Sequence, residues 1–338
     1  MEINMKKISV VENRPKLVDE IEPRPEKNEL IVELLACGIC GSDLGNIFGK
    51  SCKCTDRIGH EISGRVIEIG NQVKNFIPGE IVIINHHCPC LKCHYCIHGN
   101  ETMCEKFIEN IFPCGLSEKI LISKWIIDNG GVIKISNNLK FDELTLVEPL
   151  ACCLRAWNKI PIKNLDKVLI MGCGTIGIFH ATIAKIKGAV VTGCDFDEFR
   201  LNFGLKQKKF DNIISLSSKN SIPTEVFDLC IIANSDVDCL NHAINSIRKG
   251  GTILFFGEPQ ENAKVMINFS TVYSKEIKIL TSYSATVKDF KKSLIFLEKN
   301  FKEFRYIITH RIPLQNATEG IDIAKSGNSR IKVVITNF

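Results

Sequence analysis

The sequence lacks any apolar run close to the roughly 20 residues that a membrane-spanning helix needs. Residues 1–11 contain two lysines, but no long apolar core and no small-residue cleavage site, so we expect no secretory signal. The formal net charge is only +5, and the lysines and arginines are scattered rather than clustered. These absences argue against membrane, secreted and nucleic-acid-binding proteins. We therefore expect a cytoplasmic protein.

Internal repeats and low-complexity segments are also missing from the 338 residues. Hydrophobic residues make up 45% of the chain and charged residues 24%, which is typical of a soluble globular protein. The length is sufficient for two domains. We predict a first domain at residues 1–150, a second domain at residues 151–283, and a return of the chain to the first domain at residues 284–338.

Cysteine, by contrast, is abundant, with 16 residues. One run has the spacing C-x2-C-x2-C-x7-C and consists of Cys90, Cys93, Cys96 and Cys104. Four thiolates this close can surround one Zn²⁺ ion tetrahedrally. Because the run supplies all four ligands, no position stays open for a substrate, and we predict a structural zinc lobe at about residues 86–106. Most other cysteines are expected to be small, buried residues, although Cys52 and Cys54 in a polar loop could have a redox or metal role.

The first part of the chain has the pattern of short strands separated by turns. Glu29–Leu35 alternates apolar and charged residues, and we also expect strands at Gly64–Glu68 and Ile81–Ile84. Gly70-Asn71 and Pro78-Gly79 are turn signals. This region is predicted to be mostly β.

From about Lys167 the pattern changes to alternating strands and helices. Val168–Met171 is a continuous apolar run, as expected of a parallel strand that is buried on both faces. Further strands of this kind are expected at Ala189–Val191, Phe227–Ile232 and Thr252–Phe256. The alternation predicts an α/β domain with a doubly wound parallel sheet. A closing strand at Lys332–Ile335 could return to the first domain.

A glycine-rich turn follows the first of these buried strands. It has the form G-x-G-x-x-G and consists of Gly172, Cys173, Gly174, Thr175, Ile176 and Gly177. The three glycines permit a tight turn, close approach of a pyrophosphate and close helix–strand packing. The helix that follows offers unpaired N–H groups to phosphates. The alternative is a glycine turn in an unrelated α/β domain, but the strand–turn–helix context favours dinucleotide binding.

An acidic residue, Asp195, ends the next predicted strand about 20 residues further on. A carboxylate at this position is expected to accept hydrogen bonds from a ribose diol and to repel a 2′-phosphate. No basic residue follows directly, and Arg200 is the nearest, where it could lie along the adenosine. We therefore expect NAD as cofactor, with NADP as the less favoured alternative.

A second, open zinc site is suggested by Cys40, His60 and a distant carboxylate, Glu148. A catalytic zinc needs about three protein ligands and one exchangeable position. Taken singly these residues have other interpretations, because a lone histidine is usually structural and the pair Cys37–Cys40 could be a redox pair.

Taken together, the motifs resemble the zinc-dependent medium-chain alcohol dehydrogenase family, in particular its sorbitol (polyol) and threonine dehydrogenase branch. The resemblance covers nearly the whole chain. It rests on C-G-I-C-G-S-D at 37–43, G-H-E at 59–61, the four-cysteine lobe, E-P-L-A at 148–151 and the glycine turn. It implies a Rossmann cofactor domain beside a mostly β, GroES-like catalytic domain, with two zinc ions per chain.

The resemblance also implies roles for single residues. Cys40 and His60 would be ligands of the catalytic zinc, and Glu148 would stand at a carboxylate ligand position of this branch. Glu61 would either coordinate the zinc or lie just behind it, which leaves the choice between Glu61 and Glu148 open. Asp43 would orient the histidine ligand, and Ser42 would take the substrate's hydroxyl proton.

The sequence departs from the family pattern at a few places. Many members have a proton-relay histidine two residues after the aspartate of the first motif, and here that position is Gly45. The loop at 46–58 borders the expected substrate pocket and is unlike that of other members, as is the segment 107–117. We expect an NAD-dependent dehydrogenase for a polyol, sugar or cyclitol. One alternative is a threonine dehydrogenase, in which Lys50, Lys53 or Arg57 could bind the substrate carboxylate. Another is an amino-cyclitol biosynthetic dehydrogenase.

Two further classes of protein fit the sequence less well. A non-catalytic relative should have lost its catalytic zinc ligands, which are present here. A zinc-ribbon nucleic-acid binder would use the lobe's basic residues, such as His86 and His87, but the cofactor fold does not fit that function. By the resemblance we expect a homo-oligomer, either a tetramer or a dimer, with the strand Gly251–Phe256 and the segment after it as the candidate interface.

Overall fold

The computed structural model describes residues 4–49, 58–107, 109, 115–136, 138–218, 221–327 and 329–337. The chain divides into two compact units. The first unit is made of Met1–Ala151, Ser284–Gly327 and Lys332–Phe338, and the second of Cys152–Tyr283 with residues 328–331.

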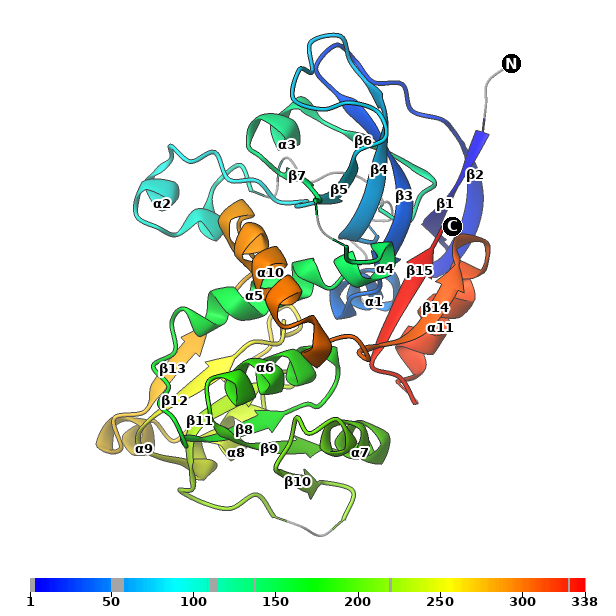
Figure 1. Cartoon of the computed structure of the whole chain (residues 1–338). Helices are drawn as coiled ribbons and strands as arrows, with labels where there is room; N and C mark the ends of the chain where they lie inside the picture. Colours follow the sequence, from blue (N-terminus) through cyan, green and yellow to red (C-terminus); the bar gives the residue numbers. More distant parts are fainter. Residues whose placement is uncertain are drawn as a thin grey trace. The chain divides into compact units, whose positions relative to one another are not determined.

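The first unit is built on mostly antiparallel β-structure, in which only the pair β14–β15 is parallel among the described strands (Figure 1). Its seven-stranded sheet has the path β14-β15-β3-β4-β5-β7, with β6 also paired to β3. The strands of this sheet are β3 (Leu30–Gly38), β4 (Glu61–Ile69), β5 (Ile81–Ile84), β6 (Lys119–Ile122), β7 (Val132–Lys134), β14 (Ile308–Pro313) and β15 (Lys332–Thr336). A separate hairpin is formed by β1 (Asn4–Val11) and β2 (Arg14–Ile21).

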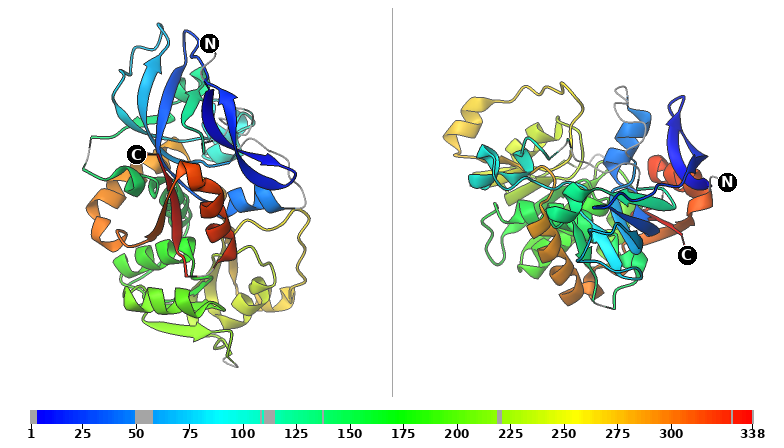
Figure 2. Two further views of the ribbon diagram at one scale, coloured as in Figure 1. Left: turned by 90° about the vertical axis from the view of Figure 1, so that its right-hand side faces the viewer. Right: turned by 90° about the horizontal axis from the view of Figure 1, so that it is seen from above.

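Short helices surround this sheet, and α11 packs against β14, β15 and β2 (Figure 2). The helices of this unit are α1 (Gly41–Phe48), α2 (His94–Ile97), α3 (Lys124–Asp128), α4 (Phe141–Leu144), α10 (Val287–Lys299) and α11 (Ala317–Ser326). Single 3₁₀ turns are η1 (Glu101–Met103), η2 (Phe301–Glu303) and η3 (Leu314–Asn316). The helix α5 (Val147–Trp157) continues from this unit into the second.

The core of the first unit explains why β3 reads as an almost continuous apolar segment. Leu30, Val32 and Leu34 belong to its main hydrophobic cluster, and eight of the nine β3 residues are buried. β3 pairs with β15, β4 and β6, so it lies in the interior of the sheet rather than at an edge. A central strand of this kind fixes the positions of the segments that leave its carboxyl end.

The second unit contains a six-stranded parallel sheet of order β10-β9-β8-β11-β12-β13. The strands are β8 (Lys167–Met171), β9 (Val190–Asp195), β10 (Asn212–Ser215), β11 (Phe227–Ile232), β12 (Ile247–Phe255) and β13 (Lys278–Thr281). The helices are α6 (Thr175–Ile186), α7 (Glu198–Lys206), α8 (Cys239–Ser246) and α9 (Phe269–Ser274). The order of strands reverses between β8 and β11, which is the point where doubly wound sheets bind ligands.

The predicted fold class is confirmed: a doubly wound parallel sheet accompanies a mostly β unit. The expected strand Phe227–Ile232 is β11, and Ile81–Ile84 is β5. β9 ends at Asp195, as predicted, and thus extends beyond the apolar run Ala189–Val191. Among the described residues, no helix combines the length and the apolar character needed to cross a membrane.

Candidate functional site

The cysteine run folds into a compact cluster, which we call the cysteine quartet (Cys90, Cys93, Cys96 and Cys104). Its ligand atoms all lie within 4.8 Å of one another. The Cys93 and Cys96 sulfur atoms are 3.6 Å apart, and those of Cys90 and Cys96 are 4.0 Å apart. This spacing is suitable for one tetrahedral zinc ion with no open position.

Backbone N–H groups are directed at the sulfur atoms of this quartet. The N–H of Cys93 donates to Cys90 Sγ at 3.3 Å, and the N–H of Cys90 donates to Cys104 Sγ at 3.2 Å. A hydrogen bond with the backbone of Cys96 lowers the pKa of the Cys93 thiol to about 6. Hydrogen bonds thus favour the thiolate form that zinc requires at Cys90 and Cys93, whereas burial raises the pKa of the Cys96 thiol to about 12 and also raises the pKa of the Cys104 thiol.

A second group of metal-ligand atoms consists of Cys40, His60 and Glu61, and we call it the mixed cluster. These atoms also lie within 4.8 Å of one another. Cys40 directly precedes α1. Glu61 is the first residue of β4 and pairs with Gly38, the last residue of β3. The fold therefore brings together residues 40 and 60, which are distant in sequence, at one end of the sheet.

Asp43 connects the segments that carry the mixed cluster. Its carboxylate accepts the N–H of Cys40 and the N–H of Gly59, each at 2.8 Å, and lies 3.2 Å from His60 Nδ1. Burial alone would raise the pKa of Asp43, but His60 and these N–H groups hold it below its usual value. Because Nδ1 of His60 faces Asp43, Nε2 is the ring nitrogen available to a metal ion.

Glu61 is held by a buried lysine, Lys332, at the start of β15. The Lys332 ammonium donates to Glu61 Oε1 at 2.5 Å and to the Ile39 carbonyl at 2.9 Å. Burial alone would lower the pKa of Lys332, but Glu61 and Cys40 raise it above its usual value. Gly38 lies between the two side chains, where an added Cβ would collide with both of them. The absence of a side chain at Gly38 is therefore what lets this ion pair form.

The other residues predicted for this site lie as follows. Glu148 is buried near the amino end of α5, but its carboxylate is not among the described atoms that form the mixed cluster. It does contribute to raising the pKa of Lys332, which places its charge in the same region. Ser42 is half-buried in the first turn of α1. Gly45 is exposed on α1, and a Cβ built there would meet nothing within 4 Å.

Most of the loop 46–58 lies outside the described residues, and so does part of the segment 107–117. The predictions made for Cys52, Cys54, Lys50, Lys53 and Arg57 all concern residues in the undescribed part of that loop.

The glycine turn has the geometry of a phosphate cradle. Gly172 has φ +98°, which favours glycine, and an added Cβ at Gly177 would collide with the Gly172 carbonyl. A Cβ at Gly174, by contrast, would meet no atom within 4 Å, so space remains open above the turn. Gly174 precedes α6 without capping it through a side chain, which leaves first-turn N–H groups for an anion. Thr175 and Ile176 begin this helix, and the Thr175 hydroxyl donates to the Ile331 carbonyl at 2.5 Å.

Asp195 lies at the carboxyl end of β9, adjacent to the glycine turn. Its carboxylate accepts the N–H of Cys173 at 2.7 Å and the N–H of Asp197 at 3.0 Å. The Arg200 guanidinium lies 3.8 Å from Asp195 and 3.3 Å from Asp197. The fold thus brings together the predicted cofactor residues Gly172, Asp195 and Arg200.

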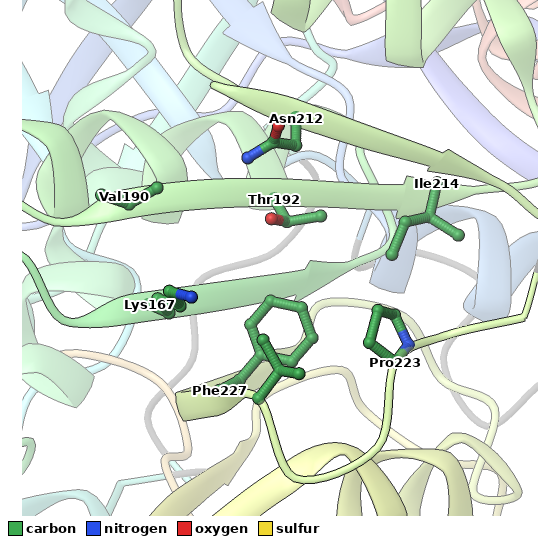
Figure 3. A pocket seen from close by; sticks show the side chains of 8 residues that line it. Lys167, Val190, Thr192, Asn212, Ile214, Pro223 and Phe227 are labelled. Carbon is green, nitrogen blue, oxygen red and sulfur yellow. The ribbon is translucent and has the colours of Figure 1, made fainter.

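A cavity of about 250 Å³ lies elsewhere in the second unit. Figure 3 shows its lining by side chains from β8, β9 and β10, with Pro223 and Phe227. Lys167 and Val190 begin their strands, so the cavity lies toward the amino ends of strands whose carboxyl ends carry the glycine turn. Its lining is mostly apolar and contains no acidic or metal-binding side chain, so it belongs to neither candidate site.

Three residues near the mixed cluster, Lys332, His86 and His87, were not predicted from the sequence to belong to a catalytic site. The signal for Lys332 was a single lysine directly before the apolar run Val333–Ile335, where a buried charge needs a partner. His86 and His87 were visible only as a histidine pair before the cysteine run. In the structure both are buried, and the His86 ring lies against that of His60, with ring centroids 4.7 Å apart.

Comparisons with known proteins identify dehydrogenase domains in two parts of the chain. Residues 26–132 match the alcohol dehydrogenase GroES-like domain, and residues 175–299 match the zinc-binding dehydrogenase domain. The chain is 26% identical over 312 residues to D-arabinitol dehydrogenase 1 of Uromyces fabae, covering 89% of this chain and 88% of the relative. It is 26% identical over 329 residues to the sorbitol dehydrogenase of Halalkalibacterium halodurans, covering 93% of each. The structure of acetophenone reductase from Geotrichum candidum in complex with NAD superposes with a TM-score of 0.85 at 22% identity, covering 99% of this chain and 98% of that one.

Proposed function

Because the chain belongs to the zinc-binding alcohol dehydrogenase family, we propose that it transfers hydride between NAD and a secondary alcohol of a polyol, sugar or cyclitol. The observation that carries this proposal is the mixed cluster: a thiolate, an imidazole and a carboxylate with their donor atoms within 4.8 Å of one another. Three donors of these types leave a coordination position for a substrate oxygen. The sorbitol and arabinitol dehydrogenases among the relatives support the substrate class.

The residues of the mixed cluster fit a zinc ion, since thiolate, imidazole and carboxylate are its usual ligands. Zinc bound there would supply Lewis-acid chemistry, which favours an alkoxide over an alcohol. Cys40 and His60 would be two ligands, and Asp43 fixes the ring orientation of His60 through Nδ1. Glu61 is the carboxylate that the structure groups with these two donors in the mixed cluster, and we propose Glu148 as the alternative carboxylate that can exchange with it.

Lys332 has a defined part in this arrangement. Its ion pair with Glu61 compensates a carboxylate that is fully buried, and it fixes the position of that carboxylate beside Cys40 and His60. If Glu61 left Lys332 to coordinate a metal, the lysine would need another anion. Glu148, whose charge already raises the pKa of Lys332, could provide it. The two carboxylates would then act as a pair.

Ser42 is the residue that we propose takes the substrate's hydroxyl proton. It is half-buried and lies two residues from Cys40, in the first turn of α1. The position that carries a relay histidine in many relatives is Gly45, so the proton must continue through a ribose hydroxyl, water or another side chain. Once the proton has left, hydride transfer to a nicotinamide is the remaining step of the oxidation.

For the cofactor we propose NAD. The open space above Gly174 and the uncapped start of α6 suit a pyrophosphate, and Asp195 suits a ribose diol. The carboxylate of Asp195 would repel a 2′-phosphate, although Arg200 lies nearby. We also propose a homo-oligomer formed through β13, an edge strand that follows α9 in the sequence, where Phe269 and Tyr273 have exposed side chains. A dimer or tetramer of this kind would be seen by light scattering.

We place the protein in a reducing compartment such as the cytoplasm. Among the residues that the structure describes, no disulfide is formed despite 13 cysteines.

The experiment that tests the proposed function is nicotinamide reduction by the zinc-loaded protein. The assay would cross NAD and NADP with polyols, cyclitols, sugars, threonine and simple secondary alcohols. Turnover with NAD on one polyhydroxylated class is the expected result, and Asp195→Ala should lower kcat/KM for NAD about tenfold or more while sparing NADP. Turnover only with simple alcohols or with threonine would contradict the substrate class. Absence of turnover together with absence of metal at the mixed cluster would contradict the proposal that the protein is a zinc-dependent dehydrogenase.

A further inference from the structure

A continuous series of aromatic rings lies between the two donor clusters of the first unit. The His60 and His86 ring centroids are 4.7 Å apart, and those of His86 and His87 are 4.0 Å apart. The series continues to Phe107, whose ring stacks on His87 at 4.4 Å with an interplanar angle of 29°. We call these four residues the ring column. Its members come from three separate segments of the chain, so sequence adjacency explains only the contact between His86 and His87.

The sheet register explains how the ring column forms. β4 and β5 are antiparallel, with Ile62 opposite Ile84. The residues just before β4 and the residues just after β5 therefore lie side by side, which brings His60 next to His86. The hydrogen bond of His87 N–H to Asn85 Oδ1 at 3.0 Å fixes the turn that follows β5.

Each end of the column is anchored in a different cluster. At one end, His60 Nδ1 lies 3.2 Å from the buried Asp43 carboxylate. At the other end, Phe107 is buried in a small apolar cluster with Cys96 and Cys104. Between them, His87 Nδ1 lies 3.2 Å from Ser284 Oγ. The two interior rings, His86 and His87, are both buried.

The anchoring of Phe107 depends on the cysteine quartet. The cluster around Phe107 contains no buried apolar side chain other than cysteine among the described residues. A core made only of sulfur atoms and one ring is small, and a bound metal ion is what holds four thiolates together in such a lobe. The position of Phe107, and through it that of His87, therefore depends on the zinc lobe being folded.

We propose that the ring column couples the folded state of the cysteine quartet to the orientation of His60, with His86, His87 and Phe107 as positioning residues for this metal ligand. Asp43 sets the rotation of the His60 ring from one side, and the face of His86 limits its tilt from the other. The lobe thereby has a second effect besides stability, because it helps to keep the mixed cluster in a geometry that binds its metal ion. This inference rests on the proposed role of His60 as a zinc ligand.

The test replaces zinc by Co²⁺ and follows the metal at the mixed cluster, so it needs no substrate. A mixed thiolate–imidazole–carboxylate site and a four-thiolate site give different absorption bands, and a chelator then reports the release of each ion. His87→Ala should weaken Co²⁺ binding at the mixed cluster about tenfold and shift its d–d bands, since partners that orient ligands typically change metal affinity 10–100-fold. His87→Phe keeps an aromatic ring and loses the hydrogen bond with Ser284, and it should behave like the wild-type protein.

Two matched controls separate positioning from general loss of stability. Ser284→Ala removes the partner of His87 and should leave the Co²⁺ bands unchanged. Phe304→Leu truncates a ring that is as fully buried as Phe107 but lies outside the column. Phe107→Leu should weaken metal binding at the mixed cluster, whereas Phe304→Leu should lower the melting temperature without that effect.

Equal effects of Phe107→Leu and Phe304→Leu, or a His87→Phe variant as impaired as His87→Ala, would overturn the coupling. These two comparisons are independent, so a single variant that fails to fold leaves the other decisive. A wild-type protein that binds Co²⁺ at the quartet but not at the mixed cluster would instead contradict the proposed function.

Discussion

The cysteine quartet and the mixed cluster achieve metal-binding geometry in opposite ways. The quartet comes from one segment of 15 residues, Cys90–Cys104, and offers four identical donor atoms. The mixed cluster comes from two segments and three donor types, and it is surrounded by the buried charges of Asp43 and Lys332. A site whose ligands all come from one segment can form once that segment is folded. The mixed cluster forms only when the pairing of β3 with β4 brings its two segments together.

The two clusters also differ in the groups that surround their donor atoms. In the quartet, the backbone supplies the support: N–H groups donate to the sulfur atoms of Cys90 and Cys104. In the mixed cluster, side chains supply the support: Asp43 faces His60, and Lys332 faces Glu61. Closed coordination with local support indicates a structural role, and open coordination with buried charged support indicates chemistry.

The largest expected effect comes from breaking the quartet with Cys93→Ala. Structural zinc sites in small domains contribute about 10–16 kcal/mol of apparent binding free energy, and this becomes folding free energy of the lobe. We expect the variant to lose more than about 5 kcal/mol of stability, seen as a much lower melting temperature and one zinc ion fewer. Metal affinity at the mixed cluster should fall about tenfold, as expected for an effect through positioning residues. A zinc-depleted variant with an unchanged melting temperature would show that the quartet is not structural.

The second effect concerns the buried ion pair of the mixed cluster. Lys332→Met leaves the Glu61 carboxylate buried without its cation, which typically costs about 3–5 kcal/mol. The loss should be largest in metal-free protein, because a bound zinc ion can take over the compensation of Glu61. Thermal unfolding with and without zinc, using Lys332→Arg as the control that keeps the charge, measures this difference. Equal destabilisation in both states would mean that Glu61 does not approach the metal.

Part of the fold and of the candidate site could be predicted from the sequence, and the rest could not. The grouping of the four quartet cysteines was predicted, because they lie in one run with a regular spacing, and their role as zinc ligands stays a prediction. The buried β-strands of the second unit and Asp195 were also predicted, because continuous apolar runs and a glycine turn are local patterns. The ion pair of Lys332 with Glu61 joins residues 271 positions apart, and the contact of His60 with His86 depends on the β4–β5 register. Such pairs carry no local signal.

The smallest expected effect comes from a substitution that adds a side chain to the surroundings of the mixed cluster. Gly45→His restores the residue that many relatives use to relay a proton, at an exposed position where a side chain meets no neighbour within 4 Å. We expect kcat for alcohol oxidation to rise about threefold to tenfold near pH 7, because proton release gains a general base. The Gly45→Ala variant separates this from the gain in helix stability. If the two variants have equal kcat, proton relay through this position does not limit the rate.

The decisive measurement compares zinc content, NAD binding and NAD reduction in the wild-type protein and in Cys40→Ser. The wild-type protein should hold two zinc ions per chain, one for each donor cluster, and should reduce NAD with a polyhydroxylated alcohol. Cys40→Ser should retain the zinc of the quartet and bind NAD, while its turnover falls below detection. A Cys40→Ser variant that still oxidises the alcohol at a rate close to the wild type would contradict the assignment of the mixed cluster as the catalytic metal site.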